Sequence, residues 1–548
     1  MWWRGKEMND VRRSEKSANR YRMTPVACMV LVLGLVLTAV GCDGPAPAEL
    51  EVTASQRVHP VLIRNEHNSL MRLTVESGAP GHRVRSFTFR LSGTDDPNDI
   101  ESLELFYAGD GENLQPGDRF GDPAGPAPEL VFRGDRELPP GKHVFWLSVR
   151  LQPDADLGHR VDAVCTAVET SAGTVEPGDE TPQVSKRIGV ALRKHMEEGV
   201  HTYRIPALAT TPKGTLLCVY DMRRRKSRDL QEDIDVGLSR STDGGRTWGT
   251  QRVIMDMGEW GGLPQEENGI GDPGILVDPE TGEIFVWAVW MWGKLGKHQW
   301  VEDGSEPGFD IARSAQVMMA RSRDDGLSWT EPRNLTRKLK QPEWWLFAPA
   351  PNQGIALADG TLVMPTQGRD RTGYPFANIT YSRDHGATWT VSSHAFSGGN
   401  ESQAVQLGDG SIMLNMRNDR KEPYRAVYVT RDLGQTWEPH PTNRKALVEP
   451  NCNGSLYRFD YREGGESKIL LLFANPNSKE GRHHHTLKLS FDQGMTWPEE
   501  HQVLLDEGRG RGYPSISRVD DRHIGIVYEG SQADLVFEKF SLEELLKR

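Results

Sequence analysis

Four arginines lie in separate segments of the chain where they could bind an acidic group of a substrate. They are Arg204 in Tyr-Arg-Ile-Pro, Arg223, Arg417 at the end of a segment that begins with Glu401, and Arg482. A guanidinium group stays charged and binds a carboxylate through two parallel hydrogen bonds. A single arginine is more simply explained by a surface ion pair, whereas several that converge would form a carboxylate site.

Aspartates that could exchange a proton with a substrate follow the second of these arginines. Asp229 comes six residues after Arg223, and Asp233 and Asp235 come shortly after it. A carboxyl group held beside a scissile bond can act as a general acid and then as a general base. Asp233 and Asp235 lie nearer to a repeated turn and also suit a structural role, so all three remain candidates at this point.

The pattern Ser/Thr-x-Asp-x-Gly-x-Ser/Thr-Trp occurs five times, and its copies begin at residues 241, 322, 382, 430 and 490. The Asp of such a turn accepts hydrogen bonds from its own backbone, and the Gly supplies a residue with positive φ. The Trp ring packs into the blade and anchors the turn. We therefore predict five hairpin turns whose aspartates have a structural and not a catalytic role.

The spacing of these turns predicts the architecture. Their mean spacing of about 62 residues suits one turn in each four-stranded blade of a β-propeller with long loops. Residues 187–548 would then form six blades, with the last blade closed by strands from both ends of the region. Side chains from different blades can meet only at the propeller axis, so a carboxylate site formed by arginines of several blades would lie there.

Residues 51–186 have a different texture. Alternating residues at 85–91, 143–149 and 161–168 predict short strands, and segments rich in Gly and Pro separate them. Short alternating strands with such turns are typical of an antiparallel β-sandwich. The predicted fold is therefore all-β, a β-sandwich followed by a six-bladed β-propeller. We find no chemical constellation in the sandwich, which could be a glycan-binding module or a spacer.

The N-terminus has the features of an export signal. Basic residues precede an apolar run at about 25–40 that ends just before Cys42. The run is shorter than the roughly 18 apolar residues of a membrane span, and with its basic flank it fits a signal over 1–42. Ala39-Val-Gly-Cys42 resembles a bacterial lipobox, although Ala39 stands where Leu is usual. We expect a lipoprotein of the cell envelope, periplasmic or on the outer surface, with a linker at 43–50. An ordinary cleaved signal with secretion, or an uncleaved anchor, is the alternative.

Composition limits the partners. The chain has 65 Lys and Arg against 77 Asp and Glu, a formal net charge of −12. That balance disfavours nucleic-acid binding, which requires a basic surface, and at first it disfavours an anionic substrate as well. The five cysteines are scattered, without the spacing of a disulfide framework or a metal site, so we expect no bound metal.

The five turns are similar to the Asp-box repeats of the sialidase (neuraminidase) superfamily, and the resemblance covers residues 187–548. Non-enzymatic propellers also carry such boxes, so further motifs must support it. The segment around Arg204 resembles the first arginine motif of the family, the segment from Glu401 to Arg417 its glutamate-to-arginine segment, and the segment ending at Arg482 the third arginine motif.

A second group of resemblances lies near the C-terminus and after the first arginine. Arg-Gly-Tyr513 resembles the family segment Gly-Tyr-Ser that contains the nucleophile, but here Pro514 replaces the Ser. Tyr-Glu529 resembles the family strand whose Glu orients the first arginine. Gly-Asp272-Pro resembles a segment whose Asp contacts the bound sugar. The spacing of Arg223 and Asp229 resembles that of the pocket arginine and catalytic aspartate of the family.

The resemblance implies a bacterial exo-α-sialidase that removes terminal sialic acids from glycoconjugates. It implies these roles: Arg204, Arg417 and Arg482 bind the substrate carboxylate, Arg223 and Asp272 line the pocket, Glu529 supports Arg204, Asp229 is the acid/base, and Tyr513 is the nucleophile with Glu401 as its base. Trp287, Trp290 and Trp292 would line an apolar pocket for the N-acetyl group or pack within blades. The implied reaction retains the anomeric configuration and requires no metal or organic cofactor.

Two other functions remain open from the sequence. A trans-sialidase or intramolecular trans-sialidase would use the same site and differ only in what accepts the sialyl group. A non-catalytic glycan-binding propeller would share the boxes but would not need Asp229, Glu401 and Tyr513, so the presence of all three favours an enzyme.

Overall fold

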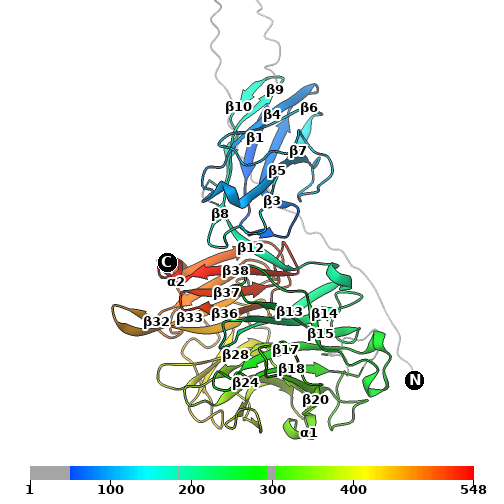
Figure 1. Ribbon diagram of the computed structural model, residues 1–548, viewed down its shortest axis with the longest axis vertical. Helices are drawn as coiled ribbons and strands as arrows, with labels where there is room; N and C mark the ends of the chain where they lie inside the picture. The colour runs from blue at the N-terminus through cyan, green and yellow to red at the C-terminus, as the bar shows by residue number, and fades with distance from the viewer. Residues whose placement is uncertain (1–49, 183, 293–299, 301–303, 548) are drawn as a thin grey trace, which may run out of the picture. The chain divides into compact units, whose positions relative to one another are not determined.

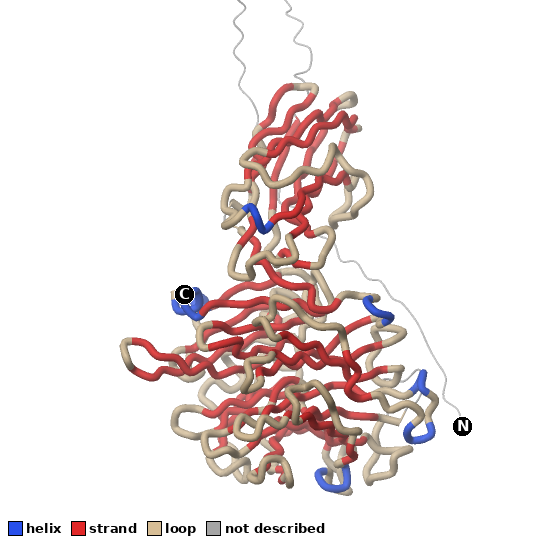
Figure 2. Tube along the Cα trace, in the orientation of Figure 1, coloured by secondary structure: helices blue, strands red, loops and turns tan. Residues whose placement is uncertain are grey.

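The computed structural model describes residues 50–182, 184–292, 300 and 304–547, and these residues form an almost entirely β structure (Figure 1, Figure 2). The two α-helices in this part of the chain are short, α1 (Thr336–Leu339) and α2 (Leu542–Leu546). The 3-10 helices are η1 (Pro97–Asp99), η2 (Glu197–Gly199), η3 (Trp260–Gly262), η4 (Gln265–Glu267) and η5 (Glu499–His501). Among the residues described, no helix has the length and apolar character needed to cross a membrane.

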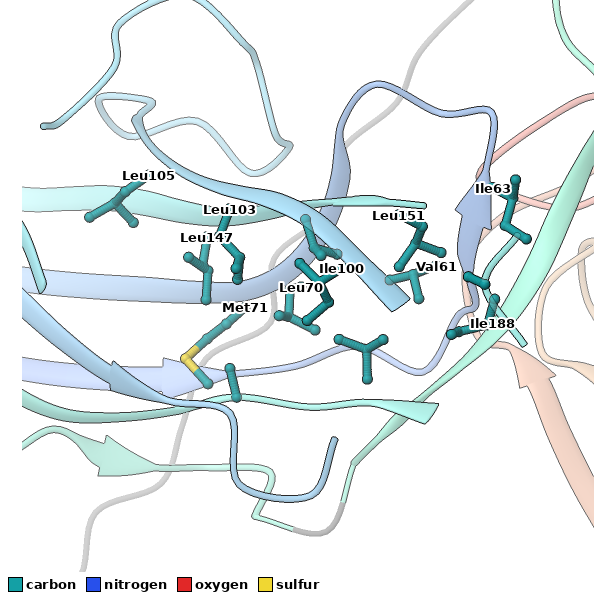
Figure 3. Packing of buried hydrophobic residues seen from close by; sticks show 14 of the residues in the cluster. Val61, Ile63, Leu70, Met71, Ile100, Leu103, Leu105, Leu147, Leu151 and Ile188 are labelled. Carbon is teal, nitrogen blue, oxygen red and sulfur yellow. The ribbon is translucent and has the colours of Figure 1, made fainter. Parts of the chain in front are cut away.

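Two sheets form the first part of the described chain. The five-stranded sheet has the order β11 (Gly178–Asp179), β1 (Leu50–Ser55), β3 (Asn68–Ser77), β7 (Gly141–Leu151) and β5 (Ile100–Tyr107). The four-stranded sheet has the order β10 (Gly173–Val175), β9 (Val164–Thr170), β4 (His82–Arg90) and β6 (Leu130–Leu138). Buried side chains from both sheets belong to one hydrophobic core, and Figure 3 shows some of its aliphatic residues, among them Leu70, Leu103 and Leu147. The predicted β-sandwich is therefore confirmed.

Six further sheets follow in the described residues, and each forms one blade of a propeller. The first has the order β13 (Thr202–Thr210), β14 (Leu216–Arg223), β15 (Ile234–Ser241) and β16 (Arg252–Met255). The second has β20 (Arg333–Asn334), β19 (Gln316–Ser322), β18 (Ile284–Trp290), β17 (Ile270–Val277) and β22 (Asn352–Gln353). The third has β21 (Leu346–Pro349), β24 (Leu362–Arg369), β25 (Pro375–Ser382) and β26 (Thr390–Val391), with β23 (Ile355–Ala356) and β27 (Phe396–Ser397) at its sides.

The other three sheets complete the propeller. The fourth has the order β28 (Gly399–Gln406), β29 (Ile412–Asn418), β30 (Ala426–Thr430) and β31 (Glu438–Pro439). The fifth has β32 (Ser455–Glu463), β33 (Glu466–Pro476), β34 (His485–Ser490) and β35 (Gln502–Asp506). The sixth has β36 (Pro514–Asp520), β37 (His523–Tyr528), β38 (Leu535–Ser541), β12 (Lys186–Arg193) and β2 (Val61–Ile63), with β8 (Arg160–Val161) beside β12.

The sixth sheet joins the two ends of the region predicted as a propeller. β12 comes from its start and pairs with β38 from its end, and Figure 1 shows the two strands side by side. This is the closure that the sequence predicts. β2 pairs in parallel with β12, although it comes from within residues 51–186. A strand of the segment predicted as sandwich thus belongs to the last blade, which no pattern in the sequence indicated.

The repeated turns form the same hydrogen bonds in all five copies. In each, the Asp carboxylate accepts a backbone N–H at 2.8–3.0 Å and a Ser or Thr hydroxyl at 2.5–2.7 Å. The Gly of each copy has a φ between 76° and 87°. Trp389 of the third copy packs edge to face against Trp287 of the preceding blade. These aspartates are used by their own turns, as the pattern predicts.

These turns should make the protein sensitive to acid. Hydrogen bonds from Ser328 and Thr388 lower the pKa of Asp324 and Asp384 to about 2. A carboxyl group whose pKa is lower in the folded state stabilises that state above its unfolded pKa of about 3.9 and loses this effect as the pH falls through the folded value. We expect the melting temperature to fall between pH 4 and pH 2. Asp384→Asn should melt lower than wild type at pH 5 and depend less on pH. Equal acid sensitivity in the variant would contradict this.

Candidate active site

The charged residues singled out in the sequence lie at one end of the propeller strands. Arg204, Asp272 and Glu401 lie near the start of β13, β17 and β28, while Arg223 and Arg417 lie at or near the end of the antiparallel neighbours β14 and β29. Since neighbouring strands run in opposite directions, the start of one strand adjoins the end of the next. In the same way Tyr513 directly precedes β36 and Glu529 directly follows β37.

β-bulges reorient three of these side chains. The pairing register shifts after Arg204 in β13, between Gly271 and Gly274 in β17, and between Gly399 and Ser402 in β28. A bulge leaves a residue unpaired and turns its strand, and bulges are frequent next to active sites. The spacing of the turns predicts the blades but not these bulges, because a shift of register depends on contacts with the neighbouring strand.

Tyr513 and Glu401 form a buried pair. The Tyr513 hydroxyl donates to Glu401 Oε1 at 2.6 Å, and the side chains come from the sixth and fourth blades. Arg417 Nη1 donates to Glu401 Oε2 at 2.9 Å and to the Tyr513 oxygen at 3.2 Å. Burial and the Glu401 charge raise the pKa of Tyr513 well above its ordinary value, against the opposing effect of the arginines. The phenol is therefore protonated at rest, and its proton has an acceptor in place.

Three arginines surround the Tyr513 ring. The guanidinium carbons of Arg204 and Arg482 lie 5.5 Å and 5.4 Å from the ring centroid, and Arg417 binds the phenol oxygen. Three blades thus bring their arginines to one place. Arg482 donates to the Arg511 carbonyl at 2.8 Å, which holds it against the segment that leads to Tyr513.

Glu529 connects Arg204 to the Tyr513 segment. Its Oε1 accepts from Arg204 Nε at 2.6 Å and from the Ile205 N–H at 2.8 Å, and its Oε2 accepts from the Tyr513 N–H at 3.1 Å. Burial alone would raise the pKa of Glu529, but Arg204 and these bonds outweigh it and lower the pKa. Glu529 is therefore a carboxylate that fixes both Arg204 and the backbone of Tyr513.

The residues on either side of Tyr513 are constrained by packing. Gly512 has a φ of 105°, and a Cβ there would lie 2.8 Å from Cys452 Sγ and 3.0 Å from Arg482 Cδ. Only glycine fits this position. Pro514, the departure from the family pattern, is the first residue of β36. A strand tolerates proline at its first position, where the N–H that proline lacks is not needed for pairing with the neighbouring strand.

An acidic cluster lies around Arg223. Its guanidinium donates to Asp221 at 2.9 Å and to Asp229 at 3.1 Å. One carboxylate oxygen from each of Asp221, Asp229 and Asp272 lies within 4.8 Å of the other two. Burial, followed by the charges of Asp229 and Asp221, raises the pKa of Asp272 well above its ordinary value. Burial also raises the pKa of Asp221 to about 6. The Asp229 side chain is 27% exposed and that of Asp221 only 1%, so Asp229 is the more accessible to a leaving group.

The other aspartates considered from the sequence have different surroundings. Arg224 binds Asp235 through two hydrogen bonds of 2.6 Å and 2.8 Å, and Gln265 approaches Asp233 at 3.5 Å. The structure therefore brings Asp229, and neither of these two, to Arg223. Asp221 was missed by the sequence reasoning, although a residue two positions before Arg223 in a strand must share its face.

The tryptophans proposed for an apolar pocket lie within blade cores. Trp287 and Trp290 are fully buried, and each belongs to a different hydrophobic cluster. Trp292 is half-buried and packs edge to face with Trp290. Of the two uses left open by the sequence, the structure shows packing.

Comparisons with known proteins match both parts of the chain. Residues 214–528 match the family described as BNR repeat-like domain, and residues 49–123 match the N-terminal domain of BNR-repeat neuraminidase. A sialidase of Bacteroides fragilis is 38% identical over 516 residues, covering 89% of this chain and 94% of the relative. A sialidase of Micromonospora viridifaciens is 34% identical over 368 residues, covering 65% and 53%. The solved Hadza microbial sialidase Hz136 has a TM-score of 0.84 and 36% identity, covering 90% of this chain and 99% of that chain.

Proposed function

The chain belongs to the bacterial BNR-repeat sialidases, and on that premise we propose that it is an exo-α-sialidase that hydrolyses terminal α-linked sialic acids with retention, using Tyr513 as the nucleophile. The observation that carries the assignment of the nucleophile is the hydrogen bond of 2.6 Å from the Tyr513 hydroxyl to Glu401. A non-catalytic glycan-binding propeller has no need of such a pair at its axis.

The first chemical step follows from this geometry. Free tyrosine has a pKa near 10 and is a weak nucleophile near neutral pH, and burial makes Tyr513 still less acidic. Glu401 therefore takes the phenol proton as the oxygen attacks the anomeric carbon. Asp229 gives a proton to the leaving oxygen, so that the aglycone departs as a neutral alcohol.

The second step reverses the role of Asp229. The same carboxylate, now deprotonated, removes a proton from water as that water attacks the anomeric carbon. The bond between this carbon and the Tyr513 oxygen breaks, and that oxygen recovers its proton from Glu401. Two displacements at one carbon restore its original configuration.

The substrate explains why the nucleophile is a tyrosine. The anomeric carbon of a sialoside bears a carboxylate, so a carboxylate nucleophile would approach a like charge and be repelled. A neutral phenol avoids this repulsion. Arg204, Arg417 and Arg482 surround the ring, where they would bind the substrate carboxylate beside the carbon that is attacked.

The decisive experiment is hydrolysis of α2,3-sialyllactose followed by NMR. We expect the α-anomer of free sialic acid to appear first and the β-anomer to grow in by mutarotation. First release of the β-anomer would contradict a covalent intermediate. A 2,7-anhydro or re-sialylated product would identify an intramolecular or intermolecular trans-sialidase, and no product at all would favour a binding protein.

Arg482→Ala tests the carboxylate site. A hydrogen bond to a charged group contributes about 1.5–3 kcal/mol, so we expect KM for a fluorogenic sialoside to rise about 10- to 100-fold. Arg482→Lys keeps the charge without the two-pronged geometry and should recover only part of the loss. Initial rates over a range of substrate concentrations give kcat and KM for each variant. An unchanged KM in both variants would exclude Arg482 from the site.

We also propose export with a lipid anchor on Cys42, a residue outside those described. The support is the basic and apolar sequence before Ala39-Val-Gly-Cys42. Such a protein would meet sialylated glycans at the cell envelope. Wild type should partition into the detergent phase of Triton X-114 and Cys42→Ala into the aqueous phase. If both proteins partitioned into the aqueous phase, the lipid anchor would be excluded and secretion would be favoured.

A further inference from the structure

The strand that follows the nucleophile is held by side chains from other blades. β36 is the innermost strand of its blade, with β37 on its outer side, so the backbone groups on its inner side need other partners. The Ile516 N–H donates to Ser455 Oγ at 3.0 Å, and the Ile516 carbonyl accepts from Gln353 Nε2. Polar side chains at the axis thus replace a neighbouring strand.

Asn352 has a special place among these side chains. It lies in β22, which belongs to the second blade, and is fully buried. Its Nδ2 donates to the Pro514 carbonyl at 2.7 Å, and its Oδ1 accepts from the Ser515 hydroxyl at 2.5 Å. Ser515 Oγ in turn accepts the Leu208 N–H of β13 at 2.8 Å. Both ends of the amide are used, so its orientation is fixed.

The backbone of Asn352 is strained where this contact is made. Its φ is 119°, a conformation that residues other than glycine rarely adopt because it is strained. Such strain persists only where the surroundings impose it. Here it accompanies a contact across the axis to the carbonyl of Pro514, the residue next to Tyr513.

We propose that Asn352 is a positioning residue for the nucleophile. Glu529 binds the Tyr513 N–H from one side, and Asn352, from another blade, binds the Pro514 carbonyl and the Ser515 hydroxyl. Together they fix the backbone that sets the direction of the Tyr513 ring and of its bond to Glu401. In the part of the chain that the structure describes, the Asn352 side chain bonds Pro514 and Ser515 and none of the arginines, carboxylates or Tyr513 of the site. Its loss therefore slows attack and leaves binding intact. This inference rests on the proposed role of Tyr513.

The test measures attack separately from binding and from proton donation. 2,3-Difluorosialic acid reacts with loss of fluoride from the anomeric carbon, a leaving group that needs no proton from Asp229, and the remaining fluorine slows breakdown of the adduct. The labelling rate of Tyr513 is followed by intact-protein and peptide mass spectrometry. The Kd for sialic acid is measured by calorimetry.

Asn352→Gly removes the amide and allows the positive φ. We expect labelling of Tyr513 to slow about 10- to 100-fold, because small misplacement of a reacting group has effects of this size, with the Kd for sialic acid within about threefold of wild type. Asn378→Ala is the matched control, since Asn378 is a fully buried amide of the third blade that bonds Thr366 and Ser392. It should lower the melting temperature without slowing labelling.

Ser515→Ala provides a second variant that keeps Asn352. It should slow labelling less than Asn352→Gly does. In the double variant the labelling rate should fall by less than the product of the two single-variant effects, because both residues act through one chain of hydrogen bonds. Labelling of Asn352→Gly at the wild-type rate, or an equal loss of labelling and sialic acid affinity, would overturn the inference. Absence of label on Tyr513 in wild type would instead overturn the proposed nucleophile.

Discussion

Tyr513→Phe is expected to lose nearly all sialidase activity while it keeps the fold and the ability to bind sialic acid. The change removes one oxygen atom, the group that donates to Glu401 at 2.6 Å. Without a nucleophile the covalent intermediate cannot form, and we expect kcat to fall by at least about 10³-fold. The arginines around the ring remain, and Glu401 keeps its bond to Arg417. The Kd for sialic acid should therefore change by less than about tenfold.

The measurement is kcat on a fluorogenic sialoside together with calorimetry on the free sugar. Tyr220→Phe is the matched control, because Tyr220 is also a buried tyrosine of the first blade, with hydrogen bonds to Ser239 of the same blade and to Arg193 at the end of β12. It should lose stability but keep kcat. A Tyr513→Phe enzyme with a rate near that of wild type would refute the nucleophile, and an equal loss in both variants would show a general effect of removing a buried phenol.

The repeated turns made the propeller predictable. Each box combines an Asp, a Gly and a Trp whose roles are local, so the pattern reports a hairpin wherever it occurs, and the spacing then gives the blades. The closure by strands from both ends was also predictable, since five boxes in six blades suit a last blade built from the two ends of the region. The pairing of β2 with β12 did not follow, because three apolar residues carry no information about their partner.

The site was predictable only in part. Arg204, Glu401, Arg417, Arg482 and Tyr513 could be found by their resemblance to family motifs, and the structure brings them together. The bulges that turn three of the inner strands depend on contacts between strands, which no local pattern records. Asn352 likewise acts on a residue 162 positions away, so nothing near it in the sequence indicates what it binds.

The net charge of −12 is a poor guide to the substrate. It describes the whole surface, whereas recognition depends on the potential inside one cleft. At the axis Arg204, Arg417 and Arg482 lie around one ring, and Glu401 and Glu529 each bind one of them. A negative protein can therefore hold a positive site for a carboxylate, and its acidic total still weighs against binding nucleic acid.

Asp229→Asn should have the second-largest effect, and its size should depend on the leaving group. Asp229 is the accessible carboxylate of the acidic cluster, held by Arg223 at 3.1 Å and by the Leu230 N–H at 3.0 Å. With sialyllactose the departing alkoxide needs a proton, and loss of a general acid should lower kcat/KM by about 10²- to 10⁴-fold.

The same variant should act very differently on substrates that need no proton. A sialoside of 4-methylumbelliferone, whose phenol is far more acidic than a sugar hydroxyl, should lose much less in the first step, and labelling by 2,3-difluorosialic acid should keep nearly its wild-type rate. Release of the label should slow, because the same carboxylate activates water. Asp221→Asn is the comparison, since the Asp221 side chain is only 1% exposed and is bound to Arg223 at 2.9 Å. If Asp229→Asn lost equal activity on all substrates, Asp229 would be a structural residue, and a leaving-group dependence in Asp221→Asn instead would move the acid to Asp221.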